Sequence, residues 1–304
     1  MNELKQRMAE VATLYYEKKY TQQEIADALG ITRQTVSKLL GDAVNERIVE
    51  IIVHNPEKDC AALQERLCER FGLRAAVVCG VSGKSETVRT LMTVKAAVRY
   101  LSPLFERGGQ NVAVSWGRTM QALVEELPEM HTRDNTVFPL FGATDNVDPC
   151  FLSNELARGM ADKLGARVQY AWFPYLPDNT EDAVLLKRTS CYKQVRALWE
   201  AIDIAVVGIG NTAVLDRFEH AFGRGVQRSA AIGDIATRFF TEDGKLLELY
   251  ENTLCASVDN LKNAKTTVAI ACGAEKISAI VGALRTGLVD VLVTDEHTAK
   301  ELLL

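Results

Sequence analysis

Residues 60–304 alternate short, nearly continuous apolar runs with longer amphipathic stretches, and this alternation restricts the fold most. We expect strands at seven apolar runs: 74–80, 110–115, 135–142, 167–173, 202–210, 265–272 and 289–294. Helical stretches lie between most of them, at about 85–101, 118–127, 151–164, 181–199, 275–286 and 295–303. Strands that are apolar on both faces belong in a parallel sheet covered by helices on each side. The sequence therefore predicts a large Rossmann-like, mostly parallel α/β domain over residues 60–304.

The first 54 residues carry a different pattern, which begins with two short helices. The apolar residues at helical spacing in the stretch 4–18 are Leu4, Met8, Val11, Ala12, Leu14 and Tyr15. Thr21 and Glu24 form a T-x-x-E capping box, in which each side chain satisfies a free backbone N–H at the start of a helix. This second helix is expected to end at Gly30, because glycine tolerates the positive φ of a sharp turn. The residues expected to face inward from it are Ile25, Ala28 and Leu29.

A third helix completes the pattern, with Thr32 as its cap and an end near Gly41. Its apolar stripe consists of Val36, Leu39 and Leu40. Helix, tight turn and helix make a helix-turn-helix. The β-branched run 47–53 is expected to form a strand beside the helices, the wing, and the polar run 54–59 a linker. We therefore predict a winged helix-turn-helix domain over residues 1–54.

The polar face of this helix pair has the side chains that read duplex DNA. Arginine can bind guanine edges or phosphate, glutamine can pair with adenine, and serine, threonine and lysine can hold phosphates. A solvated helix face is the alternative, since residues 1–55 are about neutral and the whole chain has a net charge of −5. The predicted DNA-binding residues are Gln22, Gln23, Thr32, Arg33, Gln34, Thr35, Ser37 and Lys38.

Cysteines and histidines show no metal-ligand spacing. The seven cysteines contain no C-x-x-C pair, and the four histidines are dispersed. We therefore expect reduced thiols, no metal site and no cofactor. The N-terminus lacks the features of a signal peptide, and the apolar runs are too short to span a bilayer. A cytoplasmic protein without membrane contact is expected.

Two strand-to-helix turns are candidate ligand sites in the large domain. The amides in the run Ser115, Trp116, Gly117, Arg118 and Thr119 could bind a phosphate or carboxylate, with the arginine adding charge. Gly208, Gly210 and Ala213 match G-x-G-x-x-A after a strand, which can indicate a dinucleotide site. We prefer a tight turn there, because no ribose-binding acid follows in the expected place.

Several stretches together resemble one bacterial family. LYYEKKYTQQEIADALGITRQTVSKLL, VAVSWGRTM, DIAVVGIG, AAIGDIATRFF and LVTDEHTAKELL resemble, in this order, the SorC/DeoR-type sugar-responsive transcriptional regulators. The resemblance covers nearly the whole chain. It implies that Asp234 accepts hydrogen bonds from sugar hydroxyls and that Lys276 adds a polar contact. Turn and solvated-surface roles are the alternatives for these two residues.

The same resemblance implies further pocket residues, namely Phe141, Gly142, Asp178, Asn179, Gly208 and Gly210. Phe141 stands where the deoxyribose-phosphate-responsive members place a lysine that bonds covalently to the sugar, which argues against covalent sensing here. The implied assembly is a tetramer built from two dimers. Residues 60–72 are expected either to couple the two domains or to pack in the core.

The resulting expectation is a transcriptional regulator of a carbohydrate operon and not an enzyme. Its partners would be double-stranded operator DNA and a sugar, polyol or sugar-phosphate effector. Two alternatives stay open. One is a sugar-phosphate isomerase or deaminase with an accessory DNA-binding head, and the other is a scaffold whose helix-turn-helix contacts protein.

Overall fold

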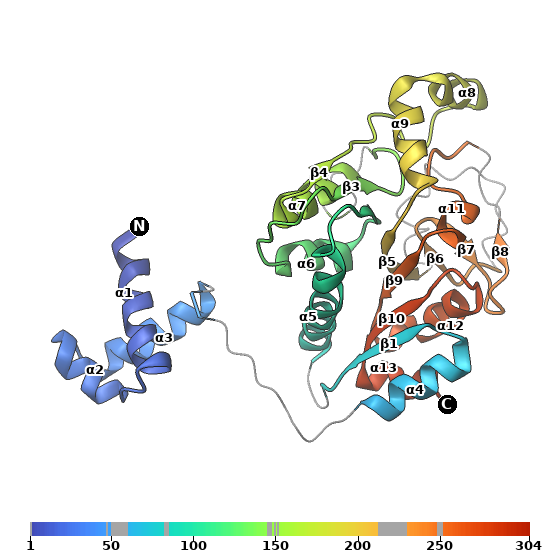
Figure 1. Ribbon diagram of the computed structural model, residues 1–304. Helices are drawn as coiled ribbons and strands as arrows, with labels where there is room; N and C mark the ends of the chain where they lie inside the picture. Colours follow the sequence, from blue (N-terminus) through green and yellow to red (C-terminus); the bar gives the residue numbers. More distant parts are fainter. Residues whose placement is uncertain are drawn as a thin grey trace. The chain divides into compact units, whose positions relative to one another are not determined.

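The computed structural model describes residues 2–46, 48–49, 60–81, 85–144, 148, 150, 152–211, 230–247 and 252–304 (Figure 1). The chain divides into two compact units, Met1–Glu57 and Lys58–Leu304. Each unit has its own apolar core, as an independently folding domain requires.

The small unit is helical in its described part. Helix α1 (Asn2–Ala12) continues as a π-helical turn, η1 (Thr13–Glu17), and is followed by α2 (Gln22–Leu29) and α3 (Arg33–Asn45). The three α-helices bury one shared core, made of Met8, Val11, Ala12, Ile25, Ala26, Val36, Leu39, Leu40 and Ala43.

The predicted turn chemistry of the small unit is confirmed. The Thr21 hydroxyl oxygen accepts the N–H of Glu24 at 3.3 Å, and the Glu24 carboxylate accepts the N–H of Thr21 at 2.8 Å. Gly30 has φ +65° at the end of α2, a left-handed conformation that favours glycine. Thr32 caps α3 by accepting the N–H of Thr35 at 3.1 Å. The helix-turn-helix is therefore specified by local contacts.

Three details of the small unit differ from the expectation, and a fourth, the wing, is not tested. Leu4 is 57% exposed, because α1 buries its residues only from Met8 onward. Ala28 is exposed, and Ala26 faces the core in its place. Helix α3 runs past Gly41 to Asn45, because Ala43 packs in the core. Most of the predicted wing, 47–53, lies outside the described residues.

A seven-stranded parallel sheet forms the centre of the large unit, in the order β1-β10-β9-β5-β2-β3-β4. This confirms the predicted mostly parallel α/β fold. The strands are β1 (Ala75–Cys79), β2 (Asn111–Val114), β3 (Thr136–Pro139), β4 (Arg167–Val168), β5 (Ile204–Asn211), β9 (Thr266–Ile270) and β10 (Val291–Asp295).

Helices cover both faces of this sheet (Figure 1). One layer consists of α5 (Glu86–Phe105), α6 (Arg118–Glu126) and α7 (Ser153–Leu164), and the other of α4 (Ala61–Phe71), α12 (Ile277–Arg285) and α13 (Glu296–Leu302). The described residues also form α8 (Thr180–Arg188), α9 (Ser190–Trp199), α11 (Val258–Lys262) and the 3₁₀ turn η4 (Ala274–Lys276). Leu67 of α4 is fully buried, so this helix packs in the core, the second of the two roles expected for 60–72.

Beyond the parallel sheet, the chain adds a small antiparallel extension. The last residues of β5 pair with β6 (Gly233–Ile235), which pairs with β7 (Arg238–Phe240) and, through it, β8 (Leu246–Leu247). Ala236 and Thr237 form the two-residue turn between β6 and β7, with φ +46° and +65°. A two-residue hairpin of this kind normally has glycine, asparagine or aspartate at such positions, so the sequence shows no hairpin signal here.

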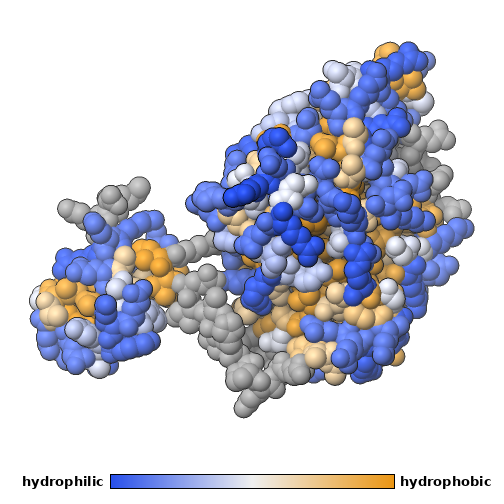
Figure 2. Space-filling view, in the orientation of Figure 1, coloured by the Kyte–Doolittle hydropathy of each residue, from blue (hydrophilic) through white to orange (hydrophobic). Residues whose placement is uncertain are grey.

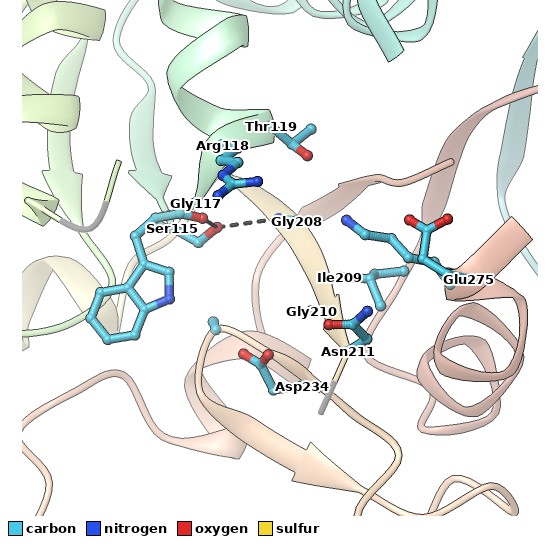
Figure 3. A pocket seen from close by; sticks show the side chains of 13 residues that line it. Ser115, Gly117, Arg118, Thr119, Gly208, Ile209, Gly210, Asn211, Asp234 and Glu275 are labelled. Atoms are coloured by element: carbon cyan, nitrogen blue, oxygen red, sulfur yellow. Dashed lines mark hydrogen bonds between the residues drawn. The ribbon is translucent and has the colours of Figure 1, made fainter. Parts of the chain in front are cut away.

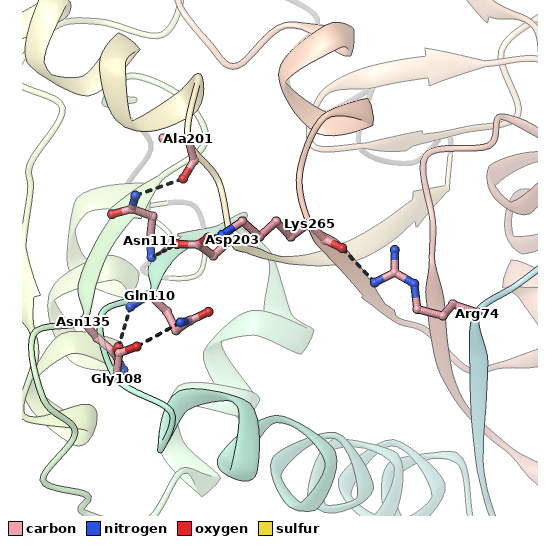
Figure 4. Close-up of polar contacts among 8 residues, drawn as sticks. All are labelled: Arg74, Gly108, Gln110, Asn111, Asn135, Ala201, Asp203 and Lys265. Carbon is pink, nitrogen blue, oxygen red and sulfur yellow. Dashed lines mark hydrogen bonds and ion pairs between the residues drawn. The ribbon is translucent and has the colours of Figure 1, made fainter.

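Side chains at the amino edge of the sheet hold the strands in register (Figure 4). Asp203 precedes β5, and its carboxylate accepts the N–H of Asn111 at the start of β2 at 2.7 Å. Asn135 precedes β3 and accepts the N–H of Gln110 at 2.8 Å. These contacts satisfy N–H groups where the strand ladders begin, which buried backbone requires.

Two predicted elements of the large unit differ most in extent. The strand expected over 167–173 ends at Val168, because the Asn154 side chain binds both the N–H and the carbonyl of Ala171. The helix expected over 181–199 divides at Thr189, whose extended backbone ends α8 and whose hydroxyl caps α9.

Candidate functional site

Helix α3 presents the predicted polar face of the small unit. Arg33, Gln34, Thr35, Ser37 and Lys38 are exposed, while the apolar stripe of the same helix is buried. Three of the predicted side chains are engaged in local hydrogen bonds. The Thr35 hydroxyl shares a hydrogen bond of 2.8 Å with the Thr32 hydroxyl, and the Gln23 amide donates to Asp27 at 2.9 Å. The outward cations and amide of α3 are the groups that suit contacts with DNA bases and phosphates.

A cavity of about 310 Å³ lies at the carboxyl ends of β2 and β5 in the large unit. From β2 the chain proceeds outward through β3 and β4 and then returns to place β5 on the other side of β2. Such a reversal of strand order leaves a crevice between the loops that follow β2 and β5, and this crevice is the usual place for a ligand in an open α/β sheet. The sheet topology therefore puts this cavity where small molecules bind.

The start of α6 opens on the cavity. Gly117, with φ +107°, turns the chain from β2 into this helix, and Arg118 and Thr119 begin it. Figure 3 shows the Arg118 guanidinium directed into the space between β5 and the helix. The free N–H groups and partial positive charge of a helix N-terminus favour an anionic ligand group.

Asp234 forms the opposite wall, in β6, which lies between β5 and β7 in the antiparallel extension (Figure 3). Its side chain is 5% exposed and accepts the N–H of Thr237 at 3.0 Å. Burial raises the pKa of Asp234 to about 6, and the Thr237 N–H and the positive charge of Lys276 act against this rise. A buried carboxylate is a strong acceptor for ligand hydroxyl groups.

The charges on the cavity wall are balanced. Arg118 and Lys276 supply two cations, and Asp234 and Glu275 supply two carboxylates. The lining also includes the indole of Trp116, whose ring packs on Phe141 with centroids 4.1 Å apart. The cavity thus offers both hydrogen-bond acceptors and anion-binding groups around one aromatic wall, a combination suited to a polyhydroxylated ligand with or without an anionic group.

Comparison with known proteins assigns the family. Residues 55–304 match the sugar-binding domain family (Sugar-bind), and residues 1–46 match sigma-70 region 4. The sorbitol operon regulator of Klebsiella pneumoniae is 33% identical, over 97% of each chain. The crystal structure of the full-length sorbitol operon regulator SorC from this organism superposes with a TM-score of 0.79 and 31% identity, over 98% of each chain. The chain belongs to the SorC/DeoR-type sugar-binding transcriptional regulators.

Further relatives of this regulator carry other regulator names. The deoxyribonucleoside regulator of Bacillus subtilis strain 168 is 28% identical over 99% of each chain. A DeoR family transcriptional regulator from Listeria monocytogenes has a TM-score of 0.68 and 26% identity, over 80% of this chain and 98% of that one. The relatives are named as regulators, which favours regulation over catalysis as the role of this chain.

The fold brings most of the predicted effector residues of this regulator to the one cavity. Gly208 and Gly210 lie within β5 and not in the predicted tight turn, because β5 extends to Asn211 to pair with β6. A Cβ added at Gly208 would meet no heavy atom within 4 Å, so the missing side chain leaves cavity space open. The predicted residues on the cavity wall are Ser115, Trp116, Gly117, Arg118, Thr119, Gly208, Gly210, Asp234 and Lys276.

Four predicted effector residues do not line this cavity. Phe141 is fully buried behind Trp116, and Gly142 follows it, where a Cβ would lie 2.6 Å from the Phe173 carbonyl oxygen. Asp178 and Asn179 lie before α8, and the Asn179 side chain caps that helix by accepting the N–H of Asp182 at 2.9 Å. Packing explains the positions of Phe141 and Gly142, and helix capping explains that of Asn179, whereas Asp178 is exposed.

The cavity also includes residues that the sequence did not indicate, namely Asn211, Ala236 and Glu275, while Ile209 lies inside the expected stretch 208–210. Asn211 and Ala236 reach it through the antiparallel extension of β5, for which no sequence signal was present. Glu275 is adjacent to the predicted Lys276 in η4, and this adjacency is the sequence signal that points to it.

The described residues add two further observations. They contain no group of three or more histidine, cysteine, aspartate or glutamate side chains placed to hold a metal ion. Within the same residues, no helix is long and apolar enough to cross a membrane.

Proposed function

We propose that the cavity between β2 and β5 binds a sugar, polyol or sugar phosphate and that its occupancy controls operator binding through α3. One observation carries this proposal. In a chain of the sugar-binding regulator family, the switch point of the sheet holds a buried carboxylate, Asp234, opposite the N-terminus of α6. The hydroxyl groups of the effector would donate to Asp234, and an anionic end would meet Arg118 and the α6 amides.

DNA recognition is assigned to the polar face of α3 and to the start of α2. Arg33 and Gln34 would contact base edges, and Lys38 would contact phosphate. The supporting residues are Gln22, Gln23, Thr32, Thr35 and Ser37. The match of residues 1–46 to sigma-70 region 4 supports this role. Because its partner is operator DNA, we place the protein in the cytoplasm.

Regulation would work by a shift between assemblies with different spacing of their DNA-binding units. An effector can move such an equilibrium only by binding the two states with different affinity. We propose a tetramer of two dimers as the assembly, with the small units paired to read half-sites. The chain itself would perform no turnover.

Catalysis is the second candidate, and one observation favours it. A carboxyl group with a pKa of about 6 near Lys276 in a ligand-sized cavity is suited to general acid–base chemistry. Incubating the full chain with sugar phosphates and following product formation separates the two functions. Isomerisation or deamination would establish the enzyme.

The regulator proposal is tested in two steps with the full chain. A thermal-shift screen of sugars, polyols and their phosphates first identifies a binder, which should raise the unfolding temperature in a concentration-dependent way. That compound should then change the affinity of the chain for DNA from its own regulated promoter. A binder that leaves DNA affinity unchanged over its full saturation range contradicts the proposal.

A further inference from the structure

Helix α8 buries very little of its own surface. Of its nine residues, Ala183 is buried and Leu186 packs partly on the core, while the helix lies against α9. Val184 and Leu185 are 44% and 59% exposed on the other side. A helix of this length is marginal in water without packing, so the uncovered apolar residues are an unpartnered surface. Figure 2 shows apolar surface over α8, bordered by hydrophilic residues.

The exposed side chains of α8 follow one helical stripe. Glu181, Val184, Leu185 and Arg188 occupy positions i, i+3, i+4 and i+7, and all four are exposed. This is the spacing by which one helix face contacts another helix. Both apolar residues lie at the centre of the stripe, with an acid one turn before them and a base one turn after them.

The stripe is complementary to its own copy. A twofold axis between Val184 and Leu185 would set two copies of α8 antiparallel, since the two ends of the stripe are equally far from that point. Glu181 of one copy would then face Arg188 of the other, twice, and the apolar centres would meet. Self-complementarity of this kind is what a twofold interface requires.

The edges of the sheet offer less to a second copy. At the β1 edge, the Gln64 side chain of α4 accepts the N–H of Val78 at 2.9 Å, which occupies a group that strand addition would need. At the other edge, β4 is only two residues long. Covered and very short edges oppose pairing between sheets, so association through helices is favoured.

We propose that α8 is a self-association surface, on which a second copy of this chain packs its own α8 antiparallel. The surface belongs to one of the two interfaces of the tetramer proposed above, and the inference rests on that assembly. Nine residues are too few for a complete standard interface, so α8 forms its centre and neighbouring surface completes it. A glutamate–arginine contact at the rim would fix the direction of the two helices.

The test measures the assembly of the full chain by sedimentation velocity over a range of protein concentrations. Leu185→Glu puts two carboxylates in the apolar centre and should give particles of half the wild-type mass. At a minimum, it should weaken this association step by about tenfold. Leu304→Glu is the matched control, because Leu304 is 90% exposed and lies at the C-terminus. It should leave the mass unchanged.

Charge exchange tests the antiparallel arrangement itself. Glu181→Arg and Arg188→Glu should each weaken association, because each places like charges opposite one another twice. The double variant restores opposite charges and should regain the wild-type mass. A role of either residue within its own helix does not predict this recovery, since residues seven positions apart are two turns distant. Circular dichroism checks that every variant keeps its helices.

Three results would overturn the inference. They are a monomeric wild-type chain, an unchanged mass for Leu185→Glu, and a double charge variant that stays dissociated. Effector binding and DNA binding are measured separately on the same samples. If the wild type responds to effector and Leu185→Glu has the same assembly mass as the wild type, the α8 interface is contradicted and the proposed regulatory function is not.

Discussion

The Ser115 hydroxyl oxygen accepts the backbone N–H of Gly208 at 3.2 Å and so joins the carboxyl ends of β2 and β5 (Figure 3). Both residues lie on the cavity wall. The backbone N–H of Ser115 in turn donates to the Val206 carbonyl at 3.0 Å. These two contacts hold together the two strands between which the chain reverses its order. The cavity is therefore built on rigid backbone, which favours a preformed ligand site.

Filling the cavity from this backbone should abolish effector binding without unfolding the protein. In Gly208→Val the new side chain enters the cavity, because a Cβ at this position has no heavy atom within 4 Å. We expect the effector-induced thermal shift to be lost and the unfolding free energy to change by less than about 1 kcal/mol. Gly233→Ala is the contrasting variant, which should lower the unfolding free energy, since its Cβ would lie 2.6 Å from the Gly210 carbonyl oxygen. A normal effector response in Gly208→Val would place the effector elsewhere.

Asp234 should make stability depend on pH. Its pKa is raised from 3.8 to about 6, so the folded state disfavours the ionised form. The stability contributed by this group is fully present below the unfolded pKa and is lost as pH rises through about 6. Asp234→Asn keeps an acceptor for the Thr237 N–H and removes the charge. Relative to the wild type, it should gain up to about 3 kcal/mol of unfolding free energy between pH 4 and pH 8.

The same variant should respond poorly to effector, since an amide is a weaker acceptor than a carboxylate. Denaturant unfolding at a series of pH values and the thermal shift at pH 8 are the measurements. Asp178→Asn serves as the control, because this exposed aspartate lies outside the cavity. It should match the wild type in both assays. If the unfolding free energies of the wild type and Asp234→Asn change with pH in parallel, Asp234 is not the titrating group.

The Asp203 carboxylate should matter for stability more than its ion pair does. It accepts the N–H of Asn111 at 2.7 Å and the Lys265 ammonium at 2.6 Å (Figure 4). Asp203→Ala leaves a backbone N–H unpaired and should cost about 2 kcal/mol. The Lys265 side chain is 79% exposed, so Lys265→Met should cost at most about 0.5 kcal/mol. Urea unfolding ranks the two variants, and equal losses would assign the stability to the ion pair.

Specific DNA binding should depend on the outward face of α3. Arg33→Ala and Gln34→Ala should each weaken binding to the native operator by about 1–3 kcal/mol and reduce discrimination against other sequences. Lys38→Ala should weaken binding to all sequences alike and lower the salt dependence by about one counterion. Arg7→Ala is the matched control, because it removes an exposed cation from α1 of the same unit. Titration of labelled operator at several salt concentrations is the assay, and equal effects at Arg7 and Arg33 would indicate non-specific attraction alone.

Local signals were sufficient for the turn of the small unit. The cap at Thr21, the glycine at Gly30 and the cap at Thr32 each act within a few residues, so the helix boundaries around the turn could be predicted. The far end of α3 could not, because its continuation to Asn45 depends on Ala43 packing against other helices. Tertiary packing also decides that Ala26 and not Ala28 faces the core, because two alanines two positions apart give almost no sequence preference for either helix face.

Apolar periodicity and turn chemistry are local properties, and they were enough to predict the alternation of strands and helices, the helix-turn-helix and the turn 115–119 on the cavity wall. The other predicted cavity residues, Gly208, Gly210, Asp234 and Lys276, were implied by the family resemblance. Tertiary packing set the return of β5 beside β2, which brings Ser115 and Gly208 together from 93 positions apart. It also decided that the β6–β7 hairpin places Asp234 in the wall, although Ala236 and Thr237 oppose such a turn. Long-range strand pairing and burial supply the free energy for these choices, and no short stretch of sequence contains either.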